Sequence, residues 1–239
     1  HRVVLVDADI GLRNLDLTLG METDIYYDLV QVIEGECTLE DALIQTKHSP
    51  NLYLLAAAQD RDKMAVSTYD MKELVSCLKE SFDYVLIDCP AGIEQGFKNA
   101  LAGADQAIVV ATPEISSIRD ADRAIALMEK QRRNLAPHLI INRYNPALVE
   151  RGEMLDVDDI WNILGLPILG VLPETEDVLI ASNRGIPVVL HRKHEITSAF
   201  ERSARRLIGE EIPLHDLHSS TSLWKWIKGL VSTSRQAAI

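Results

Sequence analysis

Two apolar runs that end in aspartate are the first feature of this sequence that could take part in binding or catalysis. Residues 3–6 are apolar and are followed by Asp7 and Asp9, and residues 84–87 are followed by Asp88. A buried strand that ends in a carboxylate can hold Mg²⁺, usually through water, beside the phosphates of a nucleotide. One such aspartate alone is a weak signal, since aspartate is also a common turn former and helix cap.

A glycine follows each of these aspartates within a few residues, at Gly11 and at Gly92. A phosphate can approach a glycine backbone closely because no Cβ obstructs it. Gly92 is therefore predicted to contact a terminal phosphate. The alternative is that the Pro-Ala-Gly segment 90–92 simply forms a turn.

The hydrophobic pattern predicts the strands and helices that must position these residues. Near-continuous apolar runs indicate strands covered on both faces, and they occupy residues 3–6, 52–56, 84–87, 107–111, 139–141 and 168–172. Helical spacing lies between them, at 71–78, 118–128 and 157–164, the last preceded by Asp156 as an N-cap. This alternation predicts an α/β fold with a doubly wound, mostly parallel sheet, whose ligands bind beyond the carboxyl ends of the strands.

Length and composition favour one large domain with a short appendage. The chain has 239 residues, 47% of them hydrophobic, which is enough to bury a sizeable core. We expect a domain over residues 1–214, a polar linker over 215–221 and a helix over 222–234. The net charge of -12 would repel a DNA backbone and an anionic bilayer alike, so any contact with either must be local. Three cysteines without metal-ligand spacing indicate a reducing, intracellular compartment.

The C-terminal segment has the pattern of an amphipathic helix that lies on a membrane surface. A helical wheel gathers its apolar residues in an arc of about 160°, and these are Leu223, Trp224, Trp226, Ile227, Leu230 and Val231. Lys225 and Lys228 fall on the opposite face, and residues 219–239 carry a charge of +3 while the remainder carries -15. This asymmetry suits an anionic bilayer. The alternative is a final helix that docks on the core.

Two long motifs now make the chain recognisable. Residues 7–17, DADIGLRNLDL, and residues 88–94, DCPAGIE, resemble the two switch segments of the MinD/ParA family of deviant Walker A ATPases. The resemblance continues in collinear order through segments 112–114, 117–123, 142–146, 170–174 and 181–185. It covers essentially the whole chain and implies a fold similar to the P-loop NTPases, with ATP and Mg²⁺ as cofactors.

The resemblance also implies roles for individual residues. Asp9 would lie in switch I near the attacking water and Mg²⁺, Asp88 would be the Walker B carboxylate that holds Mg²⁺ through water, and Asp7 would support either role. Asn142 resembles the residue that reads adenine, and Pro173 and Glu174 resemble the loop that frames the base. The expected contacts of an ATP-bound homodimer are Glu114, Asp120, Asn14 and Ser116.

One departure from the family is large. The family's phosphate-binding loop, with its signature lysine, is absent from these residues, and no Gly-Lys-Ser/Thr occurs in the chain. A first strand, that loop and a first helix would occupy roughly 30 or more residues immediately before residue 1. We therefore expect that the 239 residues alone are inactive as an ATPase.

The function that the resemblance implies is an ATP-dependent switch that positions the division septum. Such a protein would be cytoplasmic and peripheral on the inner face of a bacterial membrane, a plastid stroma remaining an alternative. It would recruit a MinC-type division inhibitor, respond to a MinE-type activator and bind no specific nucleic acid. The alternatives are a flagellar-number regulator, a ParA-type partitioning ATPase and, from another class, a non-catalytic membrane adaptor.

Two further residues are expected to be structural. Cys89 adjoins Asp88, and we expect a small residue packed beneath the sheet edge rather than a redox switch. Trp161 shares a predicted helix with Ile160 and Leu164, and we expect it in the core.

Overall fold

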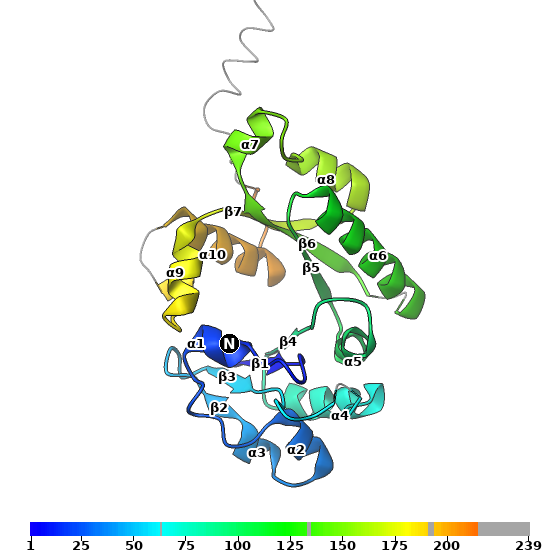
Figure 1. Cartoon of the computed structure of the whole chain (residues 1–239), viewed down its shortest axis with the longest axis vertical. Helices are drawn as coiled ribbons and strands as arrows, with labels where there is room; N and C mark the ends of the chain where they lie inside the picture. Colours follow the sequence, from blue (N-terminus) through cyan, green and yellow to red (C-terminus); the bar gives the residue numbers. More distant parts are fainter. Residues whose placement is uncertain (63, 133–134, 191–193, 215–239) are drawn as a thin grey trace, which may run out of the picture.

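The computed structural model describes residues 1–62, 64–132, 135–190 and 194–214. The predicted amphipathic helix and its linker lie outside the described residues. In Figure 1 the chain forms two halves, each with its own sheet, which follow one another along the sequence. Among the described residues, no helix is both long and apolar enough to cross a bilayer.

The first half contains a four-stranded sheet in the order β2-β3-β1-β4. β1 is parallel to β3 and to β4, whereas the short β2 is antiparallel to β3. The elements of this half are β1 (Val3–Asp7), α1 (Leu15–Leu19), α2 (Leu29–Glu34), α3 (Leu39–Ala42), β2 (Ile44–Gln45), β3 (Leu52–Leu55), α4 (Thr68–Lys79), β4 (Tyr84–Asp88) and α5 (Gln95–Gly103).

The second half contains a three-stranded parallel sheet in the order β5-β6-β7. Its elements are β5 (Ala107–Ala111), α6 (Ile115–Gln131), β6 (Pro137–Tyr144), α7 (Pro146–Glu150), α8 (Val157–Leu164), β7 (Ile168–Pro173), α9 (Glu176–Asn183), the 3₁₀ turn η1 (Val188–Leu190) and α10 (Glu195–Leu207). In Figure 1, α6 and α8 lie along one side of this sheet and α9 and α10 along the other.

The predicted strands and helices are confirmed, with small shifts at their ends. All six apolar runs form strands, and the run predicted at 139–141 extends as β6 to Tyr144. α8 begins after Asp156, whose carboxylate accepts a hydrogen bond from the backbone N–H of Asp159 at 2.6 Å. β1 is hydrophobic without interruption because both of its faces are covered. Val4 and Val6 pack in one core cluster, and Leu5 packs against another.

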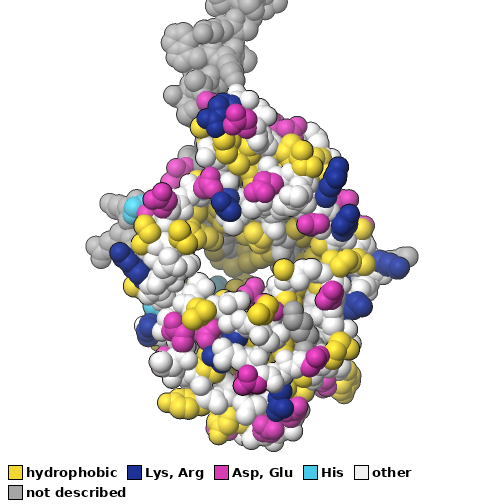
Figure 2. All heavy atoms as spheres, viewed as in Figure 1, with side chains coloured by type: hydrophobic (Ala, Val, Ile, Leu, Met, Phe, Trp, Pro, Cys, Tyr) yellow, Lys and Arg dark blue, Asp and Glu magenta, His cyan; other side chains and the backbone are white. Residues whose placement is uncertain are grey.

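The parallel sheet is divided between β4 and β5, which is a difference from the single sheet that the sequence predicts. Among the described strands, none pairs with the outer edge of β4 or of β5. Leu86 of β4 is 41% exposed and Val110 of β5 is 60% exposed. Figure 2 shows an opening between the two halves, with hydrophobic side chains behind it. The backbone groups along these two edges are therefore available to pair with a further strand.

Two glycines join the halves on one side of the opening. Gly20 ends α1 and Gly185 follows α9, with φ values of +62° and +60°. A Cβ on Gly185 would lie 2.5 Å from the Cα of Gly20, so only glycine permits this approach of the two backbones. Contact between α1 and α9 therefore fixes the end of the predicted switch I segment against the second half.

The prediction that Trp161 lies in the core is wrong. Ile160 and Leu164 of α8 are buried, but Trp161 is 53% exposed. Successive residues on a helix are separated by about 100°, so Trp161 turns away from the face that its neighbour buries.

Candidate functional site

The two aspartates at the strand tips lie side by side. Asp7 and Asp88 are the last residues of β1 and β4 and are register partners in this parallel pair. The backbone N–H of Ala8 donates to the carbonyl oxygen of Asp88 at 3.0 Å, which holds the two strand ends together. The acidic residues that the sequence singles out therefore share one edge of the sheet, as predicted for neighbouring parallel strands.

Asp7 is an acceptor for the backbone of the segment that follows it. Its side chain is 1% exposed. One oxygen accepts from the N–H of Asp9 at 3.0 Å, and the other accepts from the N–H groups of Asn14 and Leu15, both at 3.2 Å. These bonds close the loop between β1 and α1 over the carboxylate. The resemblance implies that Asp7 supports the role of Asp9 or that of Asp88; its contacts show a different use, in which Asp7 holds the predicted switch I segment in place.

Asp9 has a carboxylate oxygen without a hydrogen-bond partner in the described part of the chain. This atom, Oδ1, is buried. Its position is set locally, because the backbone carbonyl of Asp9 accepts from the N–H groups of Leu12 and Arg13, both at 3.1 Å. A buried, unpaired carboxylate oxygen is costly unless a ligand completes its coordination. Asp9 is therefore suited to bind a water molecule or a hydrated cation.

Burial and neighbouring negative charge raise the pKa of two of these aspartates, Asp88 and Asp7. Desolvation is the main cause that raises the pKa of Asp88, and the charges of Asp7 and Asp9 add to it. Desolvation likewise raises the pKa of Asp7, although its three backbone hydrogen bonds partly offset this effect. A cation beside these groups would relieve both effects.

The acidic edge fits a cation that keeps much of its water. Over the described residues, no group of three or more His, Cys, Asp and Glu side chains is arranged to hold a metal ion. Mg²⁺ commonly takes only one or two protein carboxylates and completes its octahedron with water and phosphate oxygens. The unpaired oxygen of Asp9 and the desolvated carboxyl of Asp88 match that requirement.

Gly92 has both properties that close contact with a phosphate needs. Its φ is +94°, a conformation that favours glycine, and a Cβ added there would meet nothing within 4 Å. The loop that contains it packs closely against α5, since a Cβ on Gly96 would overlap the ring of Pro90. Ala91 and Gly92 thus form a bend, and the backbone at Gly92 is open to a ligand.

The residues expected to frame the base lie at the ends of β6 and β7. Tyr144 and Pro173 are register partners after an irregularity in the pairing, and the N–H of Glu174 donates to the carbonyl of Tyr144 at 2.9 Å. Asn142 lies two residues before the end of β6. Its Oδ1 accepts from the backbone N–H of Arg143 at 3.0 Å. The ends of β6 and β7 that contain Asn142, Pro173 and Glu174 therefore adjoin.

Arg143 and Asn145 are site residues that the sequence reasoning missed. Arg143 has φ +59° and is the one non-glycine residue with positive φ in the described ranges. Its guanidinium donates to Glu174 at 3.0 Å, and the amide of Asn145 donates to the other oxygen of Glu174 at 3.4 Å. These hydrogen bonds lower the pKa of Glu174. No sequence signal predicts a left-handed arginine, which costs roughly 1–3 kcal/mol.

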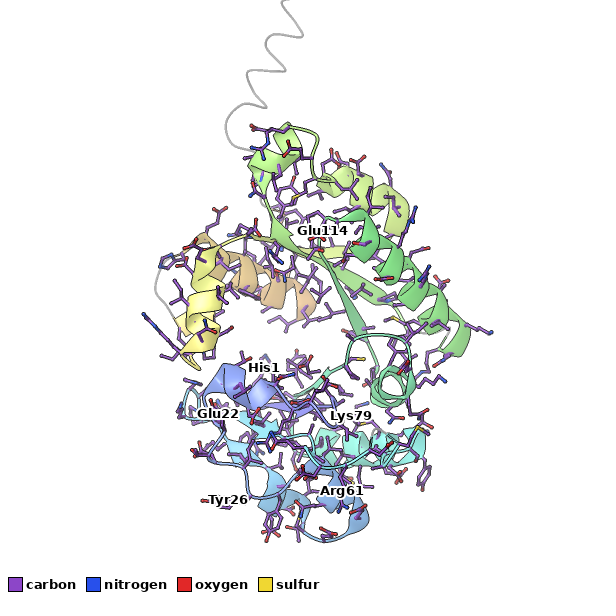
Figure 3. All side chains as sticks on the ribbon, viewed as in Figure 1. His1, Glu22, Tyr26, Arg61, Lys79 and Glu114 are labelled. Atoms are coloured by element: carbon purple, nitrogen blue, oxygen red, sulfur yellow. The ribbon has the colours of Figure 1, made fainter. Side chains whose placement is uncertain are left out.

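The residues expected at a dimer interface are exposed. Glu114 precedes α6, and Ser116 and Asp120 lie on it; Figure 3 labels Glu114 at the start of this helix in the half that contains β5. Asn14 precedes α1 in the other half. Their exposure leaves all four accessible to a second chain.

Comparison with known proteins identifies the family. A family model described as an AAA domain matches residues 1–141. The chain is 49% identical over 217 residues to the septum site-determining protein MinD of Bacillus subtilis, which covers 90% of this chain and 81% of that protein. The fold is similar to MinD in the MinC:MinD complex of Aquifex aeolicus, with a TM-score of 0.82 and 44% identity over 90% of this chain and 86% of that one.

The likeness extends to a nucleotide complex. MinD of Pyrococcus horikoshii, solved with Mg-ADP, aligns with a TM-score of 0.76 and 30% identity, covering 88% of this chain and 87% of that one. These identities extend over most of each protein and agree with the motifs at the two strand tips. The chain belongs to the MinD family of septum site-determining ATPases.

Proposed function

We propose that this chain is the switch of a division-site positioning system, which binds ATP and Mg²⁺, dimerises around ATP, binds a membrane and recruits a MinC-type inhibitor. The observation that carries the proposal is the placing of two carboxylates where β1 and β4 end: Asp88 is the last residue of β4, and Asp9, just beyond β1, has a buried Oδ1 without a hydrogen-bond partner among the described residues. The relatives support it, since one MinD structure contains Mg-ADP and another contains MinC. ATP hydrolysis, stimulated by a MinE-type activator, would release the protein from the membrane.

The roles of the site residues follow from their contacts. Bound Mg²⁺ supplies charge neutralisation beside the phosphates, and Asp88 would hold it through water. Asp9 orients the attacking water with its free oxygen, and Asp7 holds Asp9 and α1 in place through three backbone N–H groups. The backbone of Gly92 is open to the terminal phosphate.

The phosphate-binding loop is the part of this site that the 239 residues do not supply. We place one further parallel strand, followed by that loop and a helix, between the free edges of β4 and β5. The exposed Leu86 and Val110 support this placement, because a paired strand would cover both side chains. Without the loop's backbone donors and lysine, the remaining carboxylates would repel phosphate rather than bind it.

A binding experiment tests the proposal. Calorimetry with Mg-ATP is expected to show micromolar affinity and slow hydrolysis for the complete gene product, but no tight binding for the 239-residue chain. Tight binding by the 239-residue chain would show that the loop is not needed. A complete gene product that binds no nucleotide would favour the alternative, a non-catalytic membrane adaptor.

The dimer has its own test. Asp120 is exposed on α6, where it lies 3.8 Å from Arg123. Asp120→Ala is expected to weaken ATP-dependent dimerisation, measured by light scattering, while the affinity of the monomer for ATP stays unchanged. Unaltered dimerisation in this variant would remove Asp120 from the interface.

A further inference from the structure

The strained backbone at Arg143 lies where the base is expected to bind. A residue with a side chain avoids positive φ, and Arg143 at +59° is the exception within the described ranges, the other residues of that kind all being glycines. Strain of this kind persists only where surrounding contacts over-determine the conformation. The contacts around Arg143 therefore show what holds its backbone in this conformation and indicate the role of that conformation.

Three hydrogen bonds fasten the backbone around Arg143. Its guanidinium donates to one oxygen of Glu174, Asn145 donates to the other, and the N–H of Glu174 donates to the carbonyl of Tyr144. The end of β6 is thus tied to the end of β7 on both sides of Arg143. We call the Arg143–Glu174 ion pair, with its Asn145 contact, the β6–β7 latch.

The peptide that joins Asn142 to Arg143 determines which atoms Asn142 can present. The N–H of this peptide, that of Arg143, donates to the Oδ1 of Asn142 at 3.0 Å. An N–H can bond only to an acceptor, so this contact fixes which way the carboxamide is turned and leaves its NH₂ group for a ligand. Asn142 is thereby held as a hydrogen-bond donor, which suits a ring nitrogen acceptor of a purine.

We infer that Arg143 and Glu174 are positioning residues for base recognition: the β6–β7 latch stabilises the left-handed backbone at Arg143, and this turn places the preceding Asn142, with its amide, relative to the end of β7 and so toward the purine. This inference rests on the proposed nucleotide site. Arg143 acts through its backbone, and its guanidinium stabilises that backbone without touching the ligand. The latch should therefore affect binding of the base and leave the chemistry at the phosphates unchanged.

Steady-state kinetics of the complete gene product test the inference. Arg143→Ala removes the ion pair but keeps a Cβ that disfavours positive φ, so KM for Mg-ATP is expected to rise about tenfold with kcat unchanged. Glu174→Ala should have the same effect, and the double variant should be no worse than either single one, because both changes break one latch. Additive losses would overturn the inference.

Arg143→Gly is the decisive variant. Glycine adopts positive φ without strain, so KM is expected to return to within about threefold of the wild-type value although the guanidinium is gone. If Arg143→Gly is as impaired as Arg143→Ala, the guanidinium itself contacts the ligand and the inference is wrong. Thermal denaturation serves as the control for folding. If each variant melts at the same temperature as the wild type, the change in KM does not come from a loss of folding.

Two controls separate this inference from the proposed function. Arg151 and Glu153 form a comparable exposed ion pair beyond α7, at 2.8 Å, and Glu153→Ala is expected to leave KM unchanged. Tripolyphosphate, which lacks a base, should inhibit wild type and Arg143→Ala equally. Weaker inhibition of Arg143→Ala by tripolyphosphate would show that Arg143 contacts the phosphates and would overturn the inference. A wild-type protein that binds neither ATP nor tripolyphosphate would overturn the proposed function and, with it, this inference.

Discussion

Asp7 and Asp88 are register partners at the ends of β1 and β4, yet their carboxylates have different surroundings. Asp7 is buried and accepts three backbone hydrogen bonds, whereas Asp88 reaches the solvent, and partial desolvation of its carboxyl together with the charges of Asp7 and Asp9 raises its pKa. One strand tip therefore maintains the local structure, and the other is free to bind a cation. Five predictions follow from this site and from the elements around it.

The first prediction is that Asp88→Asn stabilises the fold when no cation is present. The pKa of Asp88 is raised above its ordinary value of 3.8, so the folded state binds this proton more tightly than the unfolded state does. Stability must then fall as pH rises through that range, and removing the charge should raise the melting temperature at pH 7. The gain should disappear at low pH, where Asp88 is protonated in both states. Calorimetric melts at both pH values check this, and a lower melting temperature at pH 7 would contradict it.

The second prediction separates the roles of Asp9 and Asp88 in the complete gene product. Asp88→Ala should weaken Mg²⁺-dependent nucleotide binding and turnover together, while Asp9→Ala should slow hydrolysis more than it weakens binding. Loss of a group that positions water or metal typically costs about 2 to 4 kcal/mol in the transition state, or on the order of 10² to 10³ in rate. Phosphate release assays measure this. Turnover within about threefold of wild type in both variants would remove the assigned roles.

The third prediction concerns the ion pair within switch I. Arg13 and Asp16 are 2.9 Å apart, with Asp16 only 2% exposed. Asp16→Ala leaves a largely buried guanidinium unpaired and should cost about 3 kcal/mol in the free energy of unfolding, measured with urea. Asp120 and Arg123 form an exposed pair with the same i,i+3 spacing. The matched Asp120→Ala should cost no more than about 1 kcal/mol, and equal costs for the two variants would show that burial is not decisive.

The fourth prediction is that Cys89 reacts slowly. The prediction that it packs beneath the sheet edge is wrong, since Cys89 is exposed at the end of β4. Desolvation and the charges of Asp88 and Asp9 nevertheless raise its pKa from 9.0 to about 11. A higher pKa leaves less thiolate, so alkylation by iodoacetamide at pH 8 should be about a hundredfold slower than for an unperturbed thiol. Peptide mass spectrometry can compare it with exposed Cys77, and equal rates would contradict the raised pKa.

The fifth prediction concerns the C-terminal segment, which lies outside the described residues. Each apolar side chain that inserts contributes roughly 1.5 to 3 kcal/mol at best, and ordering the helix offsets much of this, so one copy should bind weakly. ATP-driven dimerisation would add a second copy and raise avidity by about 10². Trp226→Glu should abolish ATP-dependent sedimentation with anionic liposomes, while nucleotide binding persists.

The control for the tail is a tryptophan on the described surface. Trp161 is exposed on α8, and Trp161→Glu should sediment as wild type does. Moderate salt should weaken the binding only in part, since the apolar face persists when Lys225 and Lys228 are screened. Wild-type sedimentation of Trp226→Glu would show that the tail is a docked structural helix.

Local pattern was enough to predict six strands, three of the longer helices and the aspartates at the strand tips. Continuous apolar runs predicted six strands because a strand covered on both faces has no polar side. Aspartates placed directly after two of those runs had to reach the carboxyl edge of the sheet, and the order of the motifs indicated the family. Helix α8 was predicted with its cap because the capping aspartate and the apolar spacing are both local.

Only the tertiary structure decided how those residues are used. Whether Asp7 binds a cation or the backbone depends on where the loop to α1 returns, and the strain at Arg143 depends on a partner 31 residues away. The exposure of Trp161 depends on how α8 is rotated against β6 and α6. Neighbouring residues on a helix point in different directions, so Ile160 is buried while Trp161 is exposed. Hydrogen bonds and burial join residues distant in the chain, so their geometry is set by strand register and helix packing, which residue type and spacing alone do not determine.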